Sequence, residues 1–190
     1  MKKVLLTIFF LPILLFGETT NNYKIAIGED IYYSSFSIAK TDSLILYIYR
    51  HEAEEQINYY NQNGTTQKFT HKDSTNNIDL IAIKDGKKII LKGISCENII
   101  DTVIKIDESP WKQSMSYSLS EFALSGEEKI EYWIIRLDKF KGKKMQAEKA
   151  GTEDITINDK QYHTAKVKIS AAGLRSKFWS GHYWFEVSDG

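Results

Sequence analysis

The sequence contains very little cysteine and proline. One cysteine and two prolines occur among its 190 residues. The single cysteine, Cys96, has no partner for an internal disulfide, so packing alone must stabilise the fold. Neither a histidine nor a helix start stands nearby to activate its thiol, and we interpret Cys96 as a small side chain in or beside a strand.

A second absence is an excess of basic charge. Lysine and arginine number 25, as do aspartate and glutamate. The first 17 residues hold two of the lysines, so without them 23 basic residues face 25 acidic ones and the net charge is −2. A nucleic-acid-binding protein needs a basic stripe to engage phosphates, and this composition excludes that class.

Long apolar runs are absent apart from one at the N-terminus. The second and third residues are lysines, and an apolar stretch from Val4 to Phe16 follows, ending at Gly17. This pattern is typical of a secretory signal peptide, and the run is shorter than the roughly 20 residues of a membrane span. We therefore predict a signal peptide over residues 1–17, with an uncleaved anchor as the alternative, and one domain over residues 18–190. The protein is expected in the periplasm or cell envelope of a bacterium, with the membrane involved only through export.

Catalytic and cofactor-binding motifs are missing as well. No nucleophile elbow, glycine-rich phosphate loop or Cys-x-x-Cys pair occurs. The pair His51-Glu52 resembles the start of a zinc-protease helix, but Glu55 stands where the second histidine is required. We therefore predict a protein without enzymatic activity, metal or cofactor.

The abundant residues are β-branched and aromatic, which favours strands. Apolar and polar side chains alternate from Trp111 to Ser120 and from Lys160 to Ser170, as half-buried strands require. Beyond Ser120 the apolar positions change phase, which predicts a bulge or bend near Glu121. The segment from Glu128 to Asp138 is apolar on both faces, so we expect a central strand there.

Turn-forming pairs separate these runs at short intervals. They are Asn63-Gly64, Asp85-Gly86, Ser125-Gly126, Asn158-Asp159 and Asp189-Gly190. Hairpins are expected around Asp85-Gly86 and from Ile31 to Arg50, and we favour a strand over a helical turn from His51 to Tyr60. The predicted fold is all-β: a curved antiparallel sheet or incomplete up-and-down β-barrel of about nine or ten strands, with an apolar concave face.

Aromatic side chains are concentrated in the last strand-like segment. One face carries Trp179, Tyr183, Phe185 and Val187, which core packing explains. The other face carries Phe178, His182 and Trp184, which are either covered by a loop or partner or line a groove for an apolar ligand. Our candidate ligand-binding residues are Phe178, His182, Trp184, Trp133, Trp111 and Tyr117.

A set of turns and paired aromatics spans the C-terminal third. It consists of Gly151-Thr152, the strand around Lys166-Val167-Lys168, and the run from Gly173 through Phe178-Trp179 and Tyr183-Trp184-Phe185 to Asp189-Gly190. These features resemble the exported bacterial proteins grouped as domain-of-unknown-function family 3108, most strongly from Lys143 to Gly190. The resemblance implies an exported, mostly β protein of the cell envelope, and it carries no catalytic residue across. In that family a further strand follows the acidic turn, so we expect this chain to lack a C-terminal strand.

The sequence leaves three functional hypotheses. The first is a non-enzymatic envelope protein that binds an apolar or lipid-like ligand on the concave sheet face. The second is a structural module whose exposed edge strand recruits an envelope protein partner. The third is an envelope hydrolase that uses His163 or His182 with a nearby glutamate.

Overall fold

The computed structural model describes residues 16–27, 30–157, 159–173 and 179–188. Most of the predicted signal peptide lies outside the described residues, as do the candidate ligand residue Phe178 and the predicted turn at Asp189-Gly190. The last two residues of the predicted signal peptide, Phe16 and Gly17, begin the first strand.

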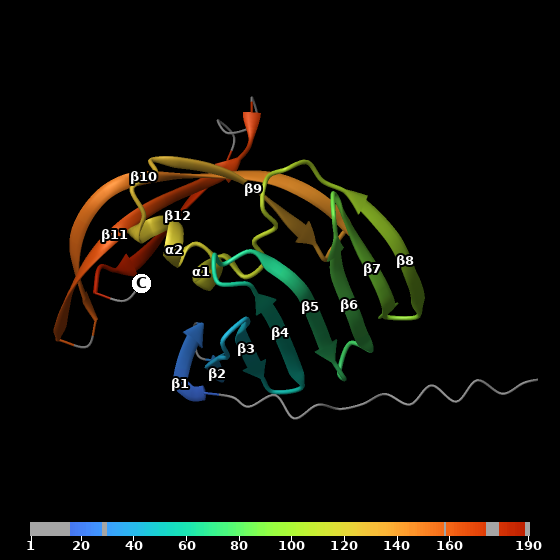
Figure 1. The fold of residues 1–190 in the computed structure, drawn as a ribbon. Helices are drawn as coiled ribbons and strands as arrows, with labels where there is room; N and C mark the ends of the chain where they lie inside the picture. Colours follow the sequence, from blue (N-terminus) through green and yellow to red (C-terminus); the bar gives the residue numbers. More distant parts are fainter. Residues whose placement is uncertain (1–15, 28–29, 158, 174–178, 189–190) are drawn as a thin grey trace, which may run out of the picture.

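The fold is all-β, as predicted, and its strands form two antiparallel sheets (Figure 1). Sheet A contains eight strands in chain order, which are β1 (Phe16–Ile27), β2 (Asp30–Lys40), β3 (Ile45–His51), β4 (Glu54–Tyr60), β5 (Thr66–Asp73), β6 (Ile78–Asp85), β7 (Lys88–Ser95) and β8 (Asn98–Lys105). Sheet B has the order β12-β11-β10-β9, with β9 (Lys129–Arg136), β10 (Lys141–Ile157), β11 (Lys160–Ala171) and β12 (Ser180–Glu186). Within the described residues the strand count is therefore twelve, more than predicted, and neither sheet closes into a barrel.

Local turn chemistry sets the hairpins of sheet A. Gly86 has a φ of +57°, a conformation that glycine adopts at little cost, and the Asp85-Gly86 turn joins β6 to β7 as predicted. The hairpin expected between Ile31 and Arg50 is formed by β2 and β3. Glu52 turns the chain at a φ of +48°, after which β4 begins, so the preference for a strand in this region is confirmed.

The predicted strand from Trp111 to Ser120, with a bulge near Glu121, is wrong. An isolated bridge joins Trp111 to Trp133, and two short helices follow: α1 (Met115–Ser118) and α2 (Ser120–Leu124). We call residues 106–128 the linking segment, because they connect the last strand of sheet A to the first strand of sheet B. In Figure 1 both helices lie between the two sheets.

Hydrogen bonds from distant strands explain why the local alternation failed there. The backbone N–H of Thr66 donates to the Trp111 carbonyl at 2.8 Å, and the Tyr60 hydroxyl donates to the Gln113 carbonyl at 2.7 Å. These contacts fix the linking segment against β4 and β5 in a conformation that no neighbouring residue dictates. Tertiary context has overridden the period-two pattern.

The strand predicted to be central, β9, is an edge strand of sheet B. Both of its faces are nonetheless covered, as its two apolar sets require. Ile135 and Trp133 pack into a hydrophobic cluster with sheet A residues such as Leu91. Tyr132 packs on the opposite side into a second cluster with α2 and the rest of sheet B. Because β9 lies between two cores, its side chains are apolar on both faces without a strand on each flank.

Sheet A turns one face toward sheet B, and we call it the inner face. Cross-strand register places two neighbouring rows of side chains on it. One row runs through Phe36, Tyr49, Gln56, His71 and Leu80, and the next runs through Ile38, Tyr47, Asn58, Phe69 and Ala82. Apolar side chains dominate the rows at β6 and β7, whereas aromatic and polar side chains alternate at β2 to β5.

Candidate ligand-binding groove

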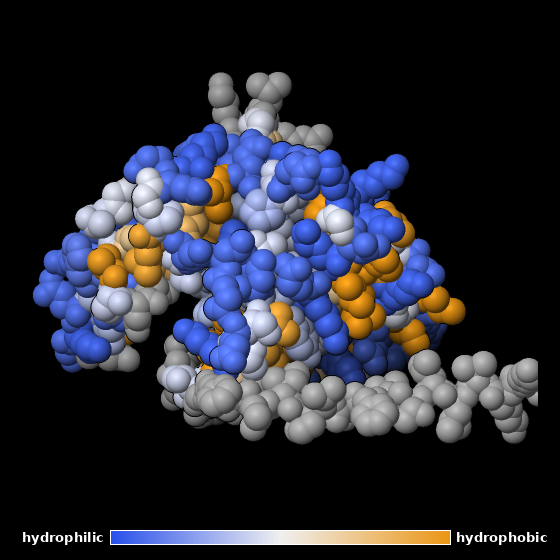
Figure 2. Space-filling view, in the orientation of Figure 1, coloured by the Kyte–Doolittle hydropathy of each residue, from blue (hydrophilic) through white to orange (hydrophobic). Residues whose placement is uncertain are grey.

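A cavity of about 330 Å³ opens between the two sheets, and we call it the aromatic groove. Its lining consists of Phe36, Tyr47, Tyr49, Gln56, Gln113, Ser114, Met115, Ser116, Ile134 and Tyr183. These residues come from β2, β3 and β4 on one side, from β9 and β12 on the other, and from the linking segment between them. Figure 2 shows a gap between the end of sheet B that carries the β10–β11 hairpin and the body of the molecule. The volume of the aromatic groove is at the lower end of the range for small-molecule sites.

Aromatic rings form the sheet A wall of the groove. The ring of Phe36 lies 5.1 Å from that of Tyr49 and 5.6 Å from that of Tyr47, between centroids. Tyr117 stacks on Tyr47 at 5.2 Å with an interplanar angle of 18°, and its other neighbour is Tyr60 at 5.3 Å. Ring pairs at these separations have a favourable geometry, so the wall is held in a defined arrangement.

The hairpin of β2 and β3 accounts for this wall. Phe36 and Tyr49 are directly paired across the two strands, and Tyr47 lies two residues from Tyr49 on the same face. On the next strand the partners are polar, because Tyr49 pairs with Gln56 and Tyr47 with Asn58. The groove is therefore aromatic toward β2 and polar toward β4.

The linking segment covers the groove and is tied to both sheets. Asn58 Nδ2 donates to Ser114 Oγ at 2.8 Å, which joins the inner face of sheet A to the start of α1. Ser114 itself has a φ of +54°, which turns the chain before the helix. From sheet B, the Tyr132 hydroxyl donates to Met115 Sδ at 3.1 Å. These contacts set the distance between the two walls.

Tyrosines in and around the groove are held in the neutral form. Burial raises the pKa of Tyr117 and of Tyr183 above the ordinary value. Burial also raises the pKa of Tyr60 well above that value, and the neighbouring phenols add to this shift. Among the described residues, no aspartate, glutamate, lysine or arginine lines the groove. Its walls are therefore uncharged at neutral pH, although its polar end is close to a carboxylate.

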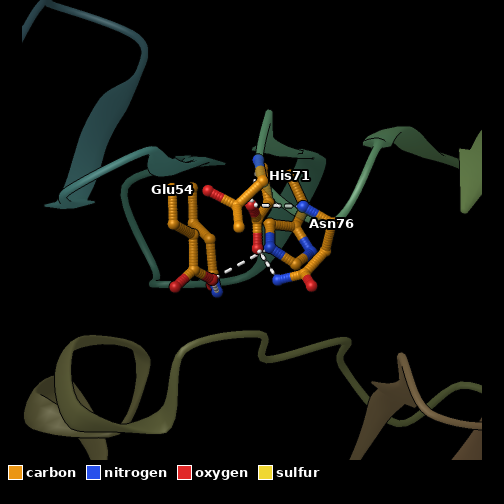
Figure 3. A network of polar contacts seen from close by, with 6 residues as sticks. Glu54, His71 and Asn76 are labelled. Carbon is orange, nitrogen blue, oxygen red and sulfur yellow. Dashed lines mark hydrogen bonds and ion pairs between the residues drawn. The ribbon is translucent and has the colours of Figure 1, made fainter. Parts of the chain in front are cut away.

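That polar end is a network around Glu54, shown in Figure 3. Gln56 Nε2 donates to Glu54 Oε1 at 2.7 Å, and His71 Nε2 lies 2.9 Å from the same oxygen. The contact with His71 is not aligned as a hydrogen bond, and neither ring nitrogen of this buried histidine has a hydrogen-bond partner in the described part of the chain. Beyond it, Asp73 accepts from the Asn76 amide at 2.7 Å, and this bond lowers the pKa of the Asp73 carboxyl.

A second and larger cavity, of about 840 Å³, has charged side chains in its lining. Lys112 lines it together with carboxylates such as Glu121 and Glu127. The Lys112 ammonium is buried and donates to the Ser118 carbonyl at 2.8 Å and the Gly64 carbonyl at 3.2 Å. Burial lowers the pKa of Lys112, and the two glutamates oppose that shift. Because backbone carbonyls already hold this ammonium, it fixes the linking segment to the turn between β4 and β5.

The candidate ligand residues are not gathered in one place. Tyr117 lies beside the aromatic groove through its stack on Tyr47. Trp111 is fully buried in the cluster between sheet A and β9 and does not line the aromatic groove. Trp133 packs against that same cluster, and its indole N–H donates to Asp107 Oδ1 at 2.9 Å. It is therefore a structural residue and not part of the groove.

The strand alternation of β12 separates His182 and Trp184 from the groove. Tyr183 and Phe185 point into the core side of sheet B, so their neighbours His182 and Trp184 lie on its outer face. Trp184 is 43% exposed, with Lys166 Nζ 5.2 Å from its ring and Glu153 accepting from its indole N–H. His182 and Trp184 line neither of the two cavities described above, and Phe178 lies outside the described residues.

The predicted core face of the last strand is correct for part of its length. Phe185 is buried and Tyr183 is half-buried, as expected. Trp179 and Val187 are exposed, at 51% and 43%, because they lie beyond the ends of β12 where the sheet no longer covers them.

Of the two histidines in the hydrolase hypothesis, His163 faces an aspartate, and His182 lies close enough to Glu153 to contribute to lowering the pKa of that carboxyl. His163 Nδ1 lies 2.7 Å from Asp154 Oδ1, and both side chains are more than half exposed on the hairpin of β10 and β11. Neither His163 nor His182 lines the two cavities described above. In the part of the chain that the structure describes, no cluster of three histidine, cysteine or carboxylate side chains is placed to hold a metal ion.

None of the groove-lining residues was among the candidate ligand residues, and the missed aromatic residues of sheet A are Phe36, Tyr47 and Tyr49. A signal for them exists, because Tyr47 and Tyr49 alternate in a strand whose hairpin partner carries Phe36. What the sequence does not show is that this face opens into a cavity and is not filled by sheet B.

Within the described residues, no helix is both long and apolar enough to cross a membrane. Comparison of the chain with protein-family models, with curated proteins and with solved structures finds no match.

Proposed function

We propose that this protein is a non-enzymatic, exported protein of the cell envelope that binds an apolar or lipid-like ligand in the aromatic groove. The observation that carries the proposal is the groove itself, which lies between two sheets and has an uncharged lining with aromatic rings on its sheet A wall. The expectation of export rests on the basic and apolar N-terminus of the sequence.

Apolar binding is the chemistry that the groove favours. A ligand that fills the space between Phe36, Tyr49 and Tyr183 removes apolar surface from water on both sides of the groove. The rings are already packed on one another, so little side-chain freedom is lost when a ligand enters. Polar atoms at the β4 end give the ligand an orientation.

The test measures binding of 1-decanol by isothermal titration calorimetry to the wild type and to two tyrosine variants. Tyr49→Ala removes a ring from the groove wall, and we expect it to weaken binding about tenfold. Tyr59→Ala is the matched control, because Tyr59 lies on the opposite face of β4 and pairs with Lys68. We expect this control to bind within about twofold of the wild type, since it leaves the groove intact. Equal loss in both variants, or no binding by the wild type, would contradict the proposal.

A further inference from the structure

The inner face carries a carboxylate directly next to the aromatic groove. Gln56 lines the groove, and Glu54 lies two residues before it on the same face of β4. Glu54 does not line the groove itself, but its side chain is 25% exposed, so a ligand that extends past Gln56 can reach it. A polar group at one end of the ligand therefore meets Glu54.

Glu54 is held in position with one oxygen still available. Its Oε1 accepts from Gln56 Nε2 at 2.7 Å and lies 2.9 Å from His71 Nε2. In Figure 3 the side chains of Glu54 and His71 point toward each other. Among the described residues, no hydrogen bond reaches the second oxygen, Oε2. A positioned carboxylate with an open oxygen attracts hydrogen-bond donors and cations.

A second acceptor lies deeper in the same region. Asn58 is fully buried, and its Nδ2 is fixed by the bond to Ser114 Oγ. Its carbonyl oxygen Oδ1 has no hydrogen-bond partner within the described residues, an arrangement that carries a desolvation cost. Because Asn58 pairs with Tyr47 and Ser114 lines the groove, this acceptor is adjacent to the groove wall.

Carboxylates lie beside the groove on the inner face of sheet A. On the inner face, Asp73 is paired with Glu54 across β4 and β5, so two carboxylates are neighbours there. The lysines and arginine of β3 to β5, which are Arg50, Lys68 and Lys72, lie on the opposite face, where Arg50 pairs with Glu55 at 2.8 Å, while His51 and His71 share the inner face with the carboxylates. An anionic head group at this end of the groove would meet carboxylates, whereas an ammonium group meets a partner for its charge and its N–H bonds.

We propose that the ligand is a cationic amphiphile whose ammonium group binds Glu54 while its apolar chain occupies the aromatic groove. This inference rests on the proposed function and names the class of ligand. The tyrosine and phenylalanine rings of the wall add to it, because aromatic faces attract cations. Glu54 supplies selectivity for the head group, and the rings supply affinity for the chain.

The experiment compares three probes that share a ten-carbon chain: decylammonium, 1-decanol and decyl sulfate, each below its micelle concentration. Binding is measured by isothermal titration calorimetry on the full chain. We expect decylammonium to bind most tightly and decyl sulfate most weakly. Glu54→Gln keeps the shape of the side chain but removes its charge, and we expect it to weaken decylammonium binding about tenfold. Its affinity for 1-decanol should stay within about twofold of the wild type, which also shows that the variant is folded.

Glu55→Gln is the matched control, because Glu55 is the neighbouring carboxylate on the opposite face of β4. It should leave the affinity for decylammonium unchanged. If the three probes bind equally well, or if both glutamine variants lose decylammonium alike, the inference is overturned while the groove remains a binding site. If no probe binds, the proposed function fails as well.

Discussion

At the scale of single residues, Lys112 shows how a buried charge is accommodated in this fold. Only 5% of the surface of Lys112 is exposed. Its ammonium donates hydrogen bonds to carbonyls of two separate segments, the β4–β5 turn and α1. A buried charge of this kind is stable only when its hydrogen bonds are made. Lys112 thereby ties the linking segment to sheet A.

Replacing this residue by an apolar one of similar length should destabilise the fold. In Lys112→Met the carbonyls of Gly64 and Ser118 lose their donor and stay buried, and we expect a loss of about 1–3 kcal/mol in the free energy of unfolding. Urea denaturation measures it. Lys129→Met is the control: Lys129 is half exposed and pairs with Glu148, so a change within about 0.5 kcal/mol is expected. Equal effects of the two substitutions would show that the carbonyl contacts of Lys112 contribute nothing.

At the scale of strands and helices, hairpins were predictable and the linking segment was not. The turn at Asp85-Gly86 is encoded by the two residues that form it, so the sequence predicts β6 and β7 correctly. Residues 111–124 alternate like a strand, but bonds from Asn58 and Tyr60, more than 50 positions earlier in the chain, fix them as a bridge and two helices. Contacts between residues so far apart in the chain cannot be predicted from a local alternation of apolar and polar side chains.

The candidate site was likewise predictable only in part. Alternation correctly placed Tyr183 and Phe185 on one face of β12 and Trp184 on the other. Which face meets a second sheet depends on how two sheets pack, and periodicity within one strand does not contain that choice. The groove residues of β2 and β3 were missed for this reason, although their pairing follows from a hairpin that the sequence predicts.

One strand of sheet A depends on a glycine. Gly93 in β7 has a φ of +136°, and a Cβ added there would lie 2.0 Å from the backbone carbonyl oxygen of Asp79. Gly93→Ala must therefore shift β6 away from β7, and we expect a destabilisation of at least about 2 kcal/mol in urea denaturation. Gly126→Ala is the control, since that position is open and has no positive φ, and it should change stability by less than about 0.5 kcal/mol. A Gly93→Ala protein as stable as the control would contradict this geometry.

At the scale of the whole molecule, buried phenols join the two sheets. Tyr60 comes from sheet A, Tyr132 and Tyr183 from sheet B, and Tyr117 from the linking segment between them. Burial raises the pKa of all four above the ordinary value for tyrosine. The folded protein therefore holds these protons more tightly than the unfolded chain does, and the contact between the sheets is sensitive to alkali.

The sign of this effect follows from the direction of the pKa shifts. Because the folded-state pKa values are raised, the stability that these phenols contribute is fully present below about pH 10, the ordinary tyrosine value. It is lost as the pH rises from there through the folded-state values, by up to about 1.4 kcal/mol per pH unit for each group. Lys112 acts in the opposite direction, since burial lowers its pKa.

We therefore expect the urea midpoint of the wild type to fall as the pH is raised from about 9 to about 11. The urea midpoint of the double variant Tyr60→Phe, Tyr132→Phe should fall less steeply over the same range. The variant loses the bond from the Tyr60 hydroxyl to the Gln113 carbonyl and the bond from Tyr132 to Met115 at every pH, so its midpoint is lower throughout. The slope, and not the midpoint at one pH, is the quantity that reports on proton release. Because phenylalanine has no proton to lose, parallel slopes for the two proteins would show that these phenols do not govern the alkaline limit of the fold. In that case the contact between the sheets would have to fail through other groups, and the raised pKa values would have no consequence for stability.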